Sequence, residues 1–459
     1  MTSSETEVST PMQAPPLSLP RKVGYGLGSS ASNFIWQMVS FYLVFFYTEI
    51  FGIPAAAVGT ILLASRIFDA LNDPLMGHIA DQTRTRWGRF RPYLLFNSVP
   101  IAVILVLTFS TPDLSMSGKI IYAAVTYLLL GVAYTAMTVP HTALMASMTQ
   151  DTNQRSSLAS TLTIAIFSTI LVVAAVTMPL VNSFSSPQMG FTITAGIYGA
   201  VAIVLYLVCF ASTRELPATQ RSRHSFREAL KLLLANKPLL ILLVAVFFTQ
   251  AANDMRTTSA IFFLKYNLGM ELFYPVFMAI MILSMIAGAL LSPVLGRKLG
   301  NKRNLYSIGM LIVIIAGTMV LFTPYENVTA IIVLLAISSA GVGITYVMTR
   351  SMLADMVEYG EWKTGVRGEG ITVSTYGVSN KLGYAAGGSL AAFLLAFSGY
   401  VPNSAQTPEA LAMIRYMLVL FPVIAGAIAV VIMLHYRVDT RSFNHILQQI
   451  RERRAANPE

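Results

Sequence analysis

The amino-acid sequence predicts an all-α membrane protein of twelve transmembrane helices in two pseudo-symmetric six-helix halves. Of its 459 residues, 55% are hydrophobic and only 11% are charged, and the mean hydropathy is +0.64. Soluble domains carry roughly 25% charged residues, so most side chains of this chain must avoid water. Apolar runs of about 20 residues, the length that crosses a ~30 Å hydrocarbon core, recur along the whole sequence.

Short polar or turn-forming segments separate the apolar runs, such as Pro112-Asp113, Ser185-Ser186-Pro187 and Gly399-Tyr400-Val401-Pro402-Asn403. In chain order, we expect helices at residues 24–49, 54–81, 93–111, 118–147, 157–183, 189–211, 236–264, 273–295, 304–323, 328–357, 371–398 and 410–436.

Lysine and arginine gather in every second loop and in the C-terminal tail. The intervening loops hold little more than Lys119 and Lys265. Positively charged loops stay in the cytoplasm, so we expect both termini inside, which requires an even number of spans. We therefore expect a multi-pass protein of the bacterial inner (plasma) membrane. The same distribution argues against nucleic acid as the reason for the net charge of +10.

The chain divides into five segments. Residues 1–20 are polar and lack the apolar core of a signal peptide, which predicts a disordered cytoplasmic tail. We expect an N-terminal six-helix bundle at 21–211, a cytoplasmic linker loop at 212–237, a C-terminal six-helix bundle at 238–436 and a cytoplasmic tail at 437–459.

A weak repeat supports the two halves. Pro74-Leu75-Met76-Gly77 ends the second expected helix, and Pro293-Val294-Leu295-Gly296 ends the eighth, 219 residues later. Each is followed by a basic loop. Six-helix repeats around a solute site at the bilayer midplane are typical of major-facilitator transporters.

Two carboxylates lie inside the second expected helix. Asp69 and Asp73 are four residues apart, so they share one helix face and lie about 5–6 Å apart. They repel each other unless a cation sits between them or one keeps its proton. With the amide oxygen of Asn72 nearby, these hard oxygen donors suit Na⁺, and the same pair can carry H⁺. The alternative is a structural ion pair with Arg66 or Lys381.

Lys381 lies about one third of the way into the eleventh expected helix. An unpaired ammonium at that depth is costly, so we expect a carboxylate partner across a central cavity, either Asp69 or Asp73. The alternative is that the side chain extends to the cytoplasmic surface.

Polar and aromatic side chains on the first and fourth helices indicate a sugar-binding surface. The amide–aromatic face of the first helix suits sugar hydroxyls and ring faces, although an interfacial aromatic belt is the alternative. Hydroxyls on the fourth helix line a polar cavity or bond to neighbouring helices. His141, on the same fourth helix, is either a proton carrier or a packing residue.

Motifs along nearly the whole chain carry a family resemblance. They are Tyr47-Thr48-Glu49, Arg66-Ile-Phe-Asp-Ala-Leu-Asn-Asp-Pro-Leu-Met-Gly77, Thr85-Arg-Trp-Gly-Arg-Phe-Arg-Pro92, Glu358-Tyr-Gly-Glu-Trp362, Gly365-Val-Arg-Gly-Glu369 and Asn380-Lys-Leu-Gly383. In these motifs the chain resembles the glycoside–pentoside–hexuronide:cation symporters, the melibiose-permease-like branch of the major facilitators. Ser398-Gly-Tyr-Val-Pro-Asn403 and Gln406-Thr-Pro-Glu409 resemble bacterial glucuronide carriers.

The resemblance implies a major-facilitator fold in which a Na⁺, Li⁺ or H⁺ gradient drives uptake, and it assigns roles to particular residues. The cation site is Asp69, Asn72, Asp73 and Thr135, and the coupling residue is Lys381. With the sugar-binding surface described above, the expected substrate residues are Asn33, Trp36, Gln37, Tyr134, Thr138, Thr142, Tyr346 and Tyr376. A cytoplasmic ion-pair gate comprises Arg155, Asp355, Glu358 and Arg367.

Departures from melibiose permease bear on the substrate. Asn33 stands where that protein has an acid, and Thr138 and Thr142 stand where it has an acid and a tryptophan. Those acids would repel a hexuronide's carboxylate, so their loss argues against α-galactosides and favours an anionic glycoside. Gly377 replaces a cation-site hydroxyl, which leaves the choice between Na⁺ and H⁺ open.

The sequence therefore predicts a Na⁺- or H⁺-coupled symporter that imports a glycoside, such as a glucuronide, by alternating access. A proton-coupled exporter or a lysolipid carrier on the same fold remains the alternative. We expect no enzyme activity, because no catalytic constellation is visible, and the single cysteine, Cys209, excludes a multi-cysteine metal site. We expect no cofactor beyond the co-transported cation, no metal site beyond Na⁺ at Asp69 and Asp73, contact with membrane lipid, and a monomer.

Overall fold

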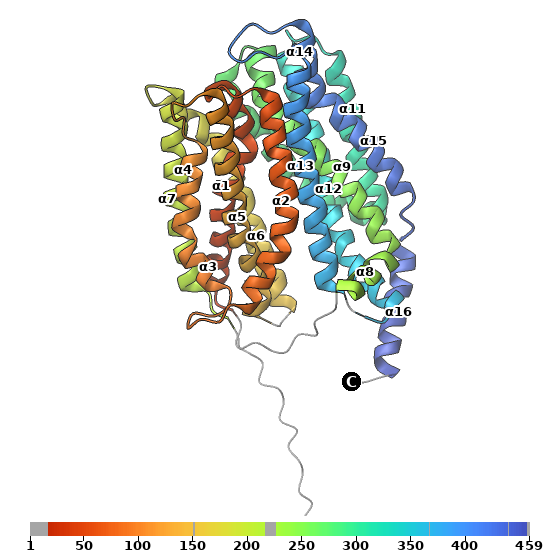
Figure 1. The fold of residues 1–459 in the computed structure, drawn as a ribbon. Coiled ribbons are helices and arrows are strands. Elements are labelled where there is room, and N and C mark those ends of the chain that lie inside the picture. Colours follow the sequence, from red (N-terminus) through yellow and green to blue (C-terminus); the bar gives the residue numbers. More distant parts are fainter. Residues whose placement is uncertain (1–16, 150–151, 216–225, 367, 439, 457–459) are drawn as a thin grey trace, which may run out of the picture.

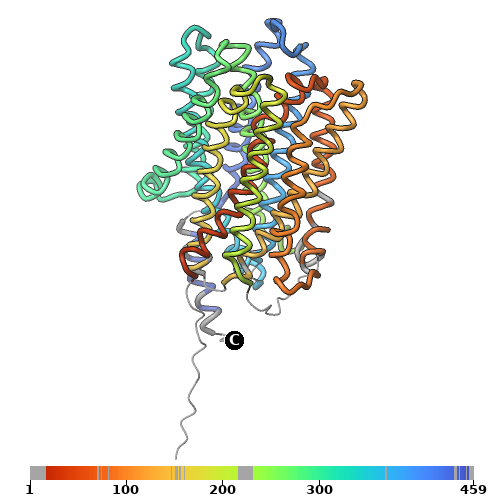
Figure 2. Tube along the Cα trace, turned by 90° about the vertical axis from the view of Figure 1, so that its left-hand side faces the viewer, coloured from red at the N-terminus to blue at the C-terminus, as the bar shows by residue number. Residues whose placement is uncertain are grey.

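The computed structural model describes residues 17–149, 152–215, 226–366, 368–438 and 440–456. The tail predicted at 1–20 lies mostly outside these residues, and the first helix already begins at Leu19. The described chain is helical apart from its loops and one isolated β-bridge between Thr85 and Gly88. The long helices run along one common direction in both views (Figures 1 and 2).

Within its described residues, the first half contains seven α-helices. They are α1 (Leu19–Phe45), extended by the π-helical turn η1 (Phe46–Ile50), α2 (Ala55–Gln82), α3 (Arg91–Phe96), α4 (Ser98–Thr108), α5 (Met116–Met148), α6 (Thr152–Asn182) and α7 (Pro187–Ser212). The third expected helix is thus broken into α3 and α4. Pro100 lacks the N–H that would bond to the carbonyl of Phe96, which explains a break at this point.

The second half adds the remaining helices. They are α8 (Phe226–Ala235), α9 (Lys237–Phe262) with η2 (Phe263–Asn267), η3 (Glu271–Phe273), α10 (Tyr274–Leu299), α11 (Lys302–Phe322), α12 (Val328–Thr364), α13 (Glu369–Phe397), α14 (Pro408–Arg415) with η4 (Tyr416–Leu420) and α15 (Phe421–Leu434), and α16 (Thr440–Ala456). The sequence did not predict α8, within the expected linker, or α16, within the expected tail. Trp362 on α12 donates to Gln449 on α16 at 2.6 Å, which fixes α16 to the bundle.

Among the described helices, eight are long and apolar enough to cross a membrane. The other predicted spans coincide with α1, α2, α4 and α13, which agrees with the expectation of twelve. Three of them, α1, α2 and α13, carry the polar residues of the interior, such as Gln37, Asp69 and Lys381, which lowers their hydropathy. The fourth, α4, is short because of the break beside Pro100.

Helix packing repeats between the halves, so the predicted pseudo-symmetric fold is confirmed. In the first half α1 packs on α6 and α7, and α2 packs on α5; in the second half α9 packs on α13 and α15, and α10 packs on α12. The halves stand side by side (Figure 1) and meet where α2 packs on α13 and α6 packs on α10.

A repeated turn marks the same symmetry in the backbone. The stretches Phe45-Phe46-Tyr47-Thr48-Glu49-Ile50-Phe51-Gly52 and Phe262-Phe263-Leu264-Lys265-Tyr266-Asn267-Leu268-Gly269 are 217 residues apart. Each ends its helix with a wide turn, closed by bonds from Phe51 N to Phe46 O at 2.8 Å and from Leu268 N to Phe263 O at 3.2 Å. Gly52 and Gly269 follow at φ +76° and +65°, a conformation that favours glycine.

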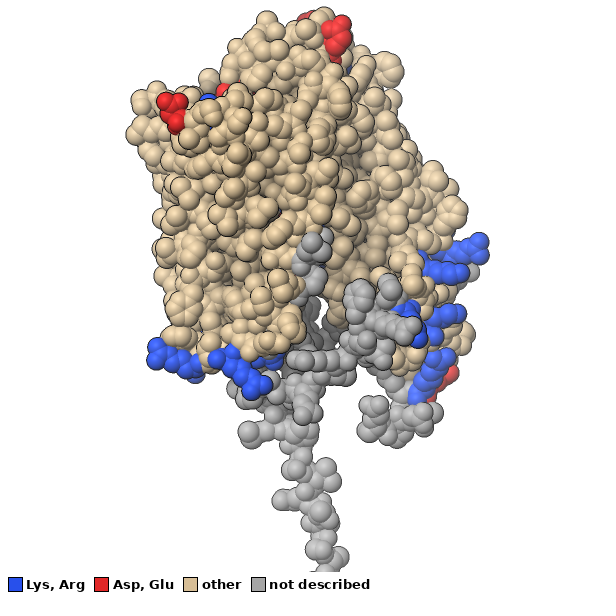
Figure 3. Space-filling model, viewed as in Figure 1, with Lys and Arg blue, Asp and Glu red and all other residues tan. Residues whose placement is uncertain are grey.

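Charge is distributed unequally between the two ends of the bundle. Lysine and arginine side chains gather at the end where α3, α8 and α16 lie, which we call the basic end (Figures 1 and 3). The opposite end, with α14, η1 and η2, is called the far end. Leu17 bonds to Gln154 at the start of α6, so the first described residues lie at the basic end, as does α16.

Candidate functional site

The two carboxylates of α2 lie between the halves and bind different partners. Asp69 accepts a bond from Arg66 at 3.3 Å. Asp73 accepts one from the hydroxyl of Thr135 on α5 at 3.0 Å and one from the ammonium of Lys381 on α13. Lys381 thus bridges the two halves, and its partner is Asp73, one of the two acids expected from the sequence.

The ion pairs that the sequence analysis left as an alternative are therefore both present. Arg66 neutralises Asp69, and Lys381 neutralises Asp73. Solvent reaches the Lys381 pair more freely, because the side chains of Lys381 and Asp73 are 37% and 23% exposed against 13% for Asp69. A water-accessible pair is the one that a dissolved cation can enter.

Asn72 and Gly131 complete the surroundings of the two acids. The Nδ2 atom of Asn72 is buried and has no hydrogen-bond partner among the described protein atoms. A β-carbon at Gly131 on α5 would lie 2.9 Å from Oδ1 of Asp69, so a larger residue there would force the carboxylate to shift. Of the four predicted cation residues, the structure brings Thr135 and Asp73 into contact, with Asp69 one helical turn away on α2; a role of Asn72 stays a prediction.

An aromatic group lies against these residues. Trp36 stacks on Tyr134 with ring centroids 4.9 Å apart, and it forms a T-shaped pair with Tyr384 of the second half at a centroid distance of 6.2 Å. The guanidinium of Arg66 lies 4.6 Å from the ring of Trp36 and donates to Tyr127 at 3.0 Å. Arg66 therefore connects the acid cluster to the aromatic surface expected to contact a sugar ring.

The other predicted polar groups of the first half are partly engaged. Gln37 donates to Asn33 at 3.3 Å, while Thr138 and Thr142 donate to carbonyls of their own helix at 3.0 and 2.8 Å. Their oxygens remain able to accept. His141 is buried and stacks on Tyr25 at 4.5 Å, which is the packing role left open above.

Tyr346 and Tyr376 line a cavity in the second half with an empty volume of about 620 Å³. Three amide side chains, those of Gln250, Asn253 and Asn380, also face it. Tyr346 reaches towards the first half, because its ring lies 5.9 Å from that of Phe167 on α6.

The predicted gate is only partly within the described side chains. Asp355 accepts from Lys302 of α11 at 2.7 Å, a contact inside the second half. The side chain of Arg155 and the whole of Arg367 lie outside the described residues, and Glu358 has an interaction partner. A gate between halves at this end stays a prediction.

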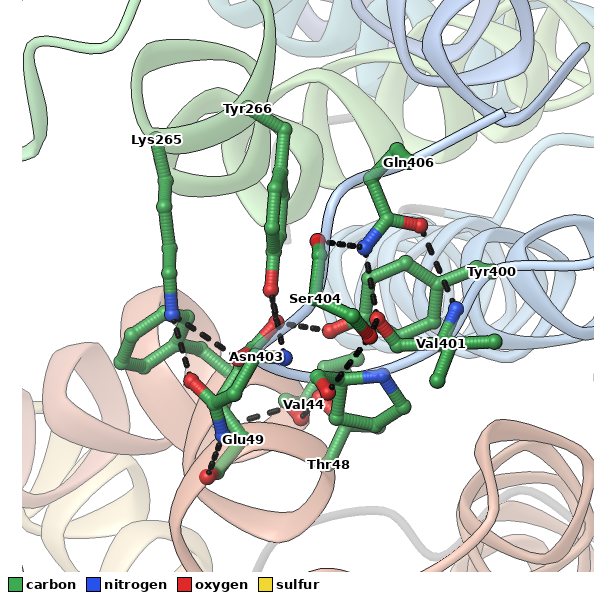
Figure 4. A network of polar contacts seen from close by, with 12 residues as sticks. Val44, Thr48, Glu49, Lys265, Tyr266, Tyr400, Val401, Asn403, Ser404 and Gln406 are labelled. Atoms are coloured by element: carbon green, nitrogen blue, oxygen red, sulfur yellow. Dashed lines mark hydrogen bonds and ion pairs between the residues drawn. The ribbon is translucent and has the colours of Figure 1, made fainter. Parts of the chain in front are cut away.

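At the far end, a buried cluster around Glu49 joins the halves (Figure 4). The Glu49 carboxylate is 0% exposed and accepts from Lys265 at 2.9 Å. It also accepts from the hydroxyls of Tyr266 and Tyr400 and from the backbone N–H of Asn403 at 3.0 Å. We call these five residues the far-end latch. It joins η1 to η2 and to the 398–407 loop, so this end is closed.

The family follows from comparison with known proteins. The sequence model of the family described as MFS/sugar transport protein matches residues 24–440. The chain belongs to this family. A glucuronide carrier protein homolog of Escherichia coli K12 is 35% identical, with 94% of this chain and 95% of that protein covered. The inner membrane symporter YicJ of the same bacterium is 33% identical, with 96% of each covered.

Solved structures show the same fold. A bacterial homologue of the human lysosomal transporter Spinster, in an inward-facing and unoccupied conformation, superposes with a TM-score of 0.66 at 13% identity. The match covers 91% of this chain and 98% of that one. The predicted fold class and family resemblance are thus confirmed, and the protein is a multi-pass sugar transporter.

Sequence reasoning missed two contacts between the transporter's halves. Asp254 on α9 is buried and accepts from Ser40 on α1 at 3.0 Å. An acid in the middle of a predicted span is a signal for a functional residue, and it was available here. Glu49 gave no such signal, because it ends its span, where a charge normally reaches water.

Proposed function

We propose that this sugar transporter is a cation-coupled symporter whose cation site comprises Asp69, Asn72, Asp73 and Thr135. The observation that carries the proposal is the bond of Lys381 to Asp73 across the two halves, beside Thr135. An ammonium here occupies the position at which a small cation would meet the carboxylate. Lys381 and the transported cation then compete for Asp73.

Competition supplies the coupling. When Na⁺ enters among the oxygen donors, or a proton binds Asp73, the ammonium of Lys381 is released from α2. The contact between α2 and α13 weakens, and the cation-loaded site presents a different surface to the sugar. Coupling between the two ligands is reciprocal, so each raises the affinity for the other by the same factor.

The basic end faces the cytoplasm in this proposal, because positively charged loops stay on that side. The far-end latch then closes the outer entrance, and a sugar bound between the halves is released to the inside. Import requires the latch to break in each cycle, when the halves rock about the central site. Similarity to the inner membrane symporter YicJ supports a location in the bacterial inner membrane.

A glycoside carrying a carboxylate is the substrate that we propose. The glucuronide carrier homolog supports it by similarity, and so does the replacement of acids by Asn33, Thr138 and Thr142 on the sugar-facing helices. Trp36 and Tyr134 offer a stacked aromatic surface for one sugar face, and the amides of α1 offer hydrogen bonds to its hydroxyls.

Uptake into proteoliposomes tests the proposal. Labelled methyl β-D-glucuronide is supplied with a Na⁺ gradient alone, a pH gradient alone, or neither. One of the two gradients is expected to drive accumulation in the parent chain. Asp73→Asn is expected to abolish accumulation and to retain exchange of labelled for unlabelled sugar.

Asp113→Asn makes the same chemical change at an exposed acid of the far-end loop and serves as the control. It is expected to leave accumulation unchanged. Accumulation by Asp73→Asn equal to that of the parent would remove the proposed cation site.

A further inference from the structure

Arg350 on α12 is a cation whose described neighbours include two aromatic rings and no paired acid. Its guanidinium lies 4.8 Å from the ring of Tyr376 and 5.4 Å from that of Tyr346. Both tyrosines line the cavity of the second half. Among the described residues, no carboxylate forms an ion pair with Arg350. This arginine therefore differs from Arg66 and Lys381, each of which has an aspartate.

Most hydrogen-bond donors of Arg350 remain available. The guanidinium carries five N–H groups, and within the described part of the chain it makes a single bond, to the hydroxyl of Tyr346 at 3.4 Å. The side chain is exposed, and the rings of Tyr346 and Tyr376 lie beside its guanidinium. A guanidinium with free N–H groups can bind a carboxylate in a bidentate arrangement.

Arg256 lines the same cavity as Tyr346 and Tyr376, the two tyrosines beside Arg350. It is bonded to the hydroxyls of Ser338 and Ser339 at 3.1 and 2.6 Å and to the carbonyl of Leu335 at 2.9 Å. The cavity lining contains this arginine, several amides and hydroxyls, and no acidic residue within the described chain. Its local potential is therefore positive.

The charges in the middle of the bundle do not balance. Among the described residues of this region there are four cationic side chains and three carboxylates. The cations are Arg66, Arg256, Arg350 and Lys381, and the carboxylates are Asp69, Asp73 and Asp254. Binding of one further cation at Asp69 and Asp73 raises the excess to two charges. A substrate with one negative charge would lower that excess again.

We propose that Arg350 binds the carboxylate of an anionic glycoside and thereby sets the transporter's preference for hexuronides over neutral glycosides. This inference rests on the proposed function and assigns the sugar's acidic group to a particular residue. It also predicts the direction of the coupling. The cation bound on α2 adds positive charge, which raises the affinity for an anionic sugar beside α12 and leaves the contacts to the neutral part of the sugar unchanged.

Two sugars that differ in one group test the inference. Methyl β-D-glucuronide and methyl β-D-glucoside are titrated into the purified full-length transporter, and the Kd of each is measured by calorimetry. The parent chain is expected to bind the glucuronide at least tenfold more tightly. Arg350→Met is expected to weaken glucuronide binding tenfold to a hundredfold, with less than a threefold effect on the glucoside.

Arg350→Lys keeps the charge and loses the planar pair of donors, so an intermediate glucuronide Kd is expected. Lys363→Gln removes an exposed positive charge outside the cavity and is the control. Equal affinity of the parent for both sugars, or equal weakening of both by Arg350→Met, overturns the inference. If Arg350→Met does not fold, the test uses two other measurements. These are the parent's preference for the glucuronide over the glucoside and the reduction of that preference in Arg350→Lys.

These titrations need no gradient, so the two proposals fail separately. If the parent prefers the glucuronide but no gradient drives uptake, the coupling is contradicted and the role of Arg350 is supported. Gradient-driven uptake of the glucoside without any glucuronide preference contradicts the role of Arg350 and supports the coupling.

Discussion

Glu49→Gln should open the far end of the transporter. The substitution keeps the shape of the side chain and removes the charge that holds the far-end latch. The carboxylate is fully buried and paired with Lys265, and three further donors bond to it. Removing one partner of a buried ion pair costs about 3–5 kcal/mol. Lys265 is 18% exposed, so we take the lower value, about 3 kcal/mol.

In the proposed alternating-access cycle the latch residues meet only when the far end is closed, so that loss applies to the closed conformation alone. A change of about 3 kcal/mol shifts the ratio of closed to open molecules by roughly a hundredfold. The shift is measurable as a distance between spin labels. Leu114 in the first half and Leu272 in the second are exposed at the far end, and cysteines there, in a Cys209→Ala background, accept the labels.

Glu49→Gln is expected to move the distance distribution towards longer values. Glu409→Gln removes an exposed acid of the same end and should leave the distribution unchanged. A Glu49→Gln distribution that superposes on that of the parent would refute the role of the latch, as would an equal shift in both variants.

The remaining predictions concern the cation site. Thr135→Val removes the hydroxyl that donates to Asp73 at 3.0 Å, so the cation concentration for half-maximal uptake should rise about threefold to tenfold; superposable cation titrations would contradict this. Lys381→Gln removes the competitor for Asp73, so direct binding of the coupling cation should tighten about tenfold while accumulation is lost; weaker cation binding would exclude competition. Arg350→Met should selectively weaken glucuronide binding, as described above.

The fold could be predicted because the membrane leaves few choices. A span needs a long apolar run and internal backbone hydrogen bonds, so α5 to α7 and α9 to α12 were visible in composition alone. The Lys381–Asp73 pair was expected as one of two possibilities for the same reason, since an unpaired ammonium at that depth is costly. Details set by local packing, such as the break beside Pro100 and the helices α8 and α16, carried no comparable signal.

The far-end latch could not be predicted, because its members come from distant segments. Glu49 lies in η1, Lys265 and Tyr266 lie in η2, and Tyr400 and Asn403 lie in a loop whose backbone reaches φ +55° at Asn403. No spacing in the sequence brings these residues together. Arg350 was visible as a charge inside a span, but its lack of an acidic partner among the described residues became evident only from the packing of Tyr346 and Tyr376.

The most direct test of competition at Asp73 is the dependence of sugar affinity on the cation. The Kd of methyl β-D-glucuronide is measured over a range of Na⁺ concentrations and, separately, over a range of pH, for the parent chain and for Asp73→Asn. The account predicts that one cation lowers the Kd in the parent and that neither does so in the variant. The same cation dependence in both proteins would contradict it.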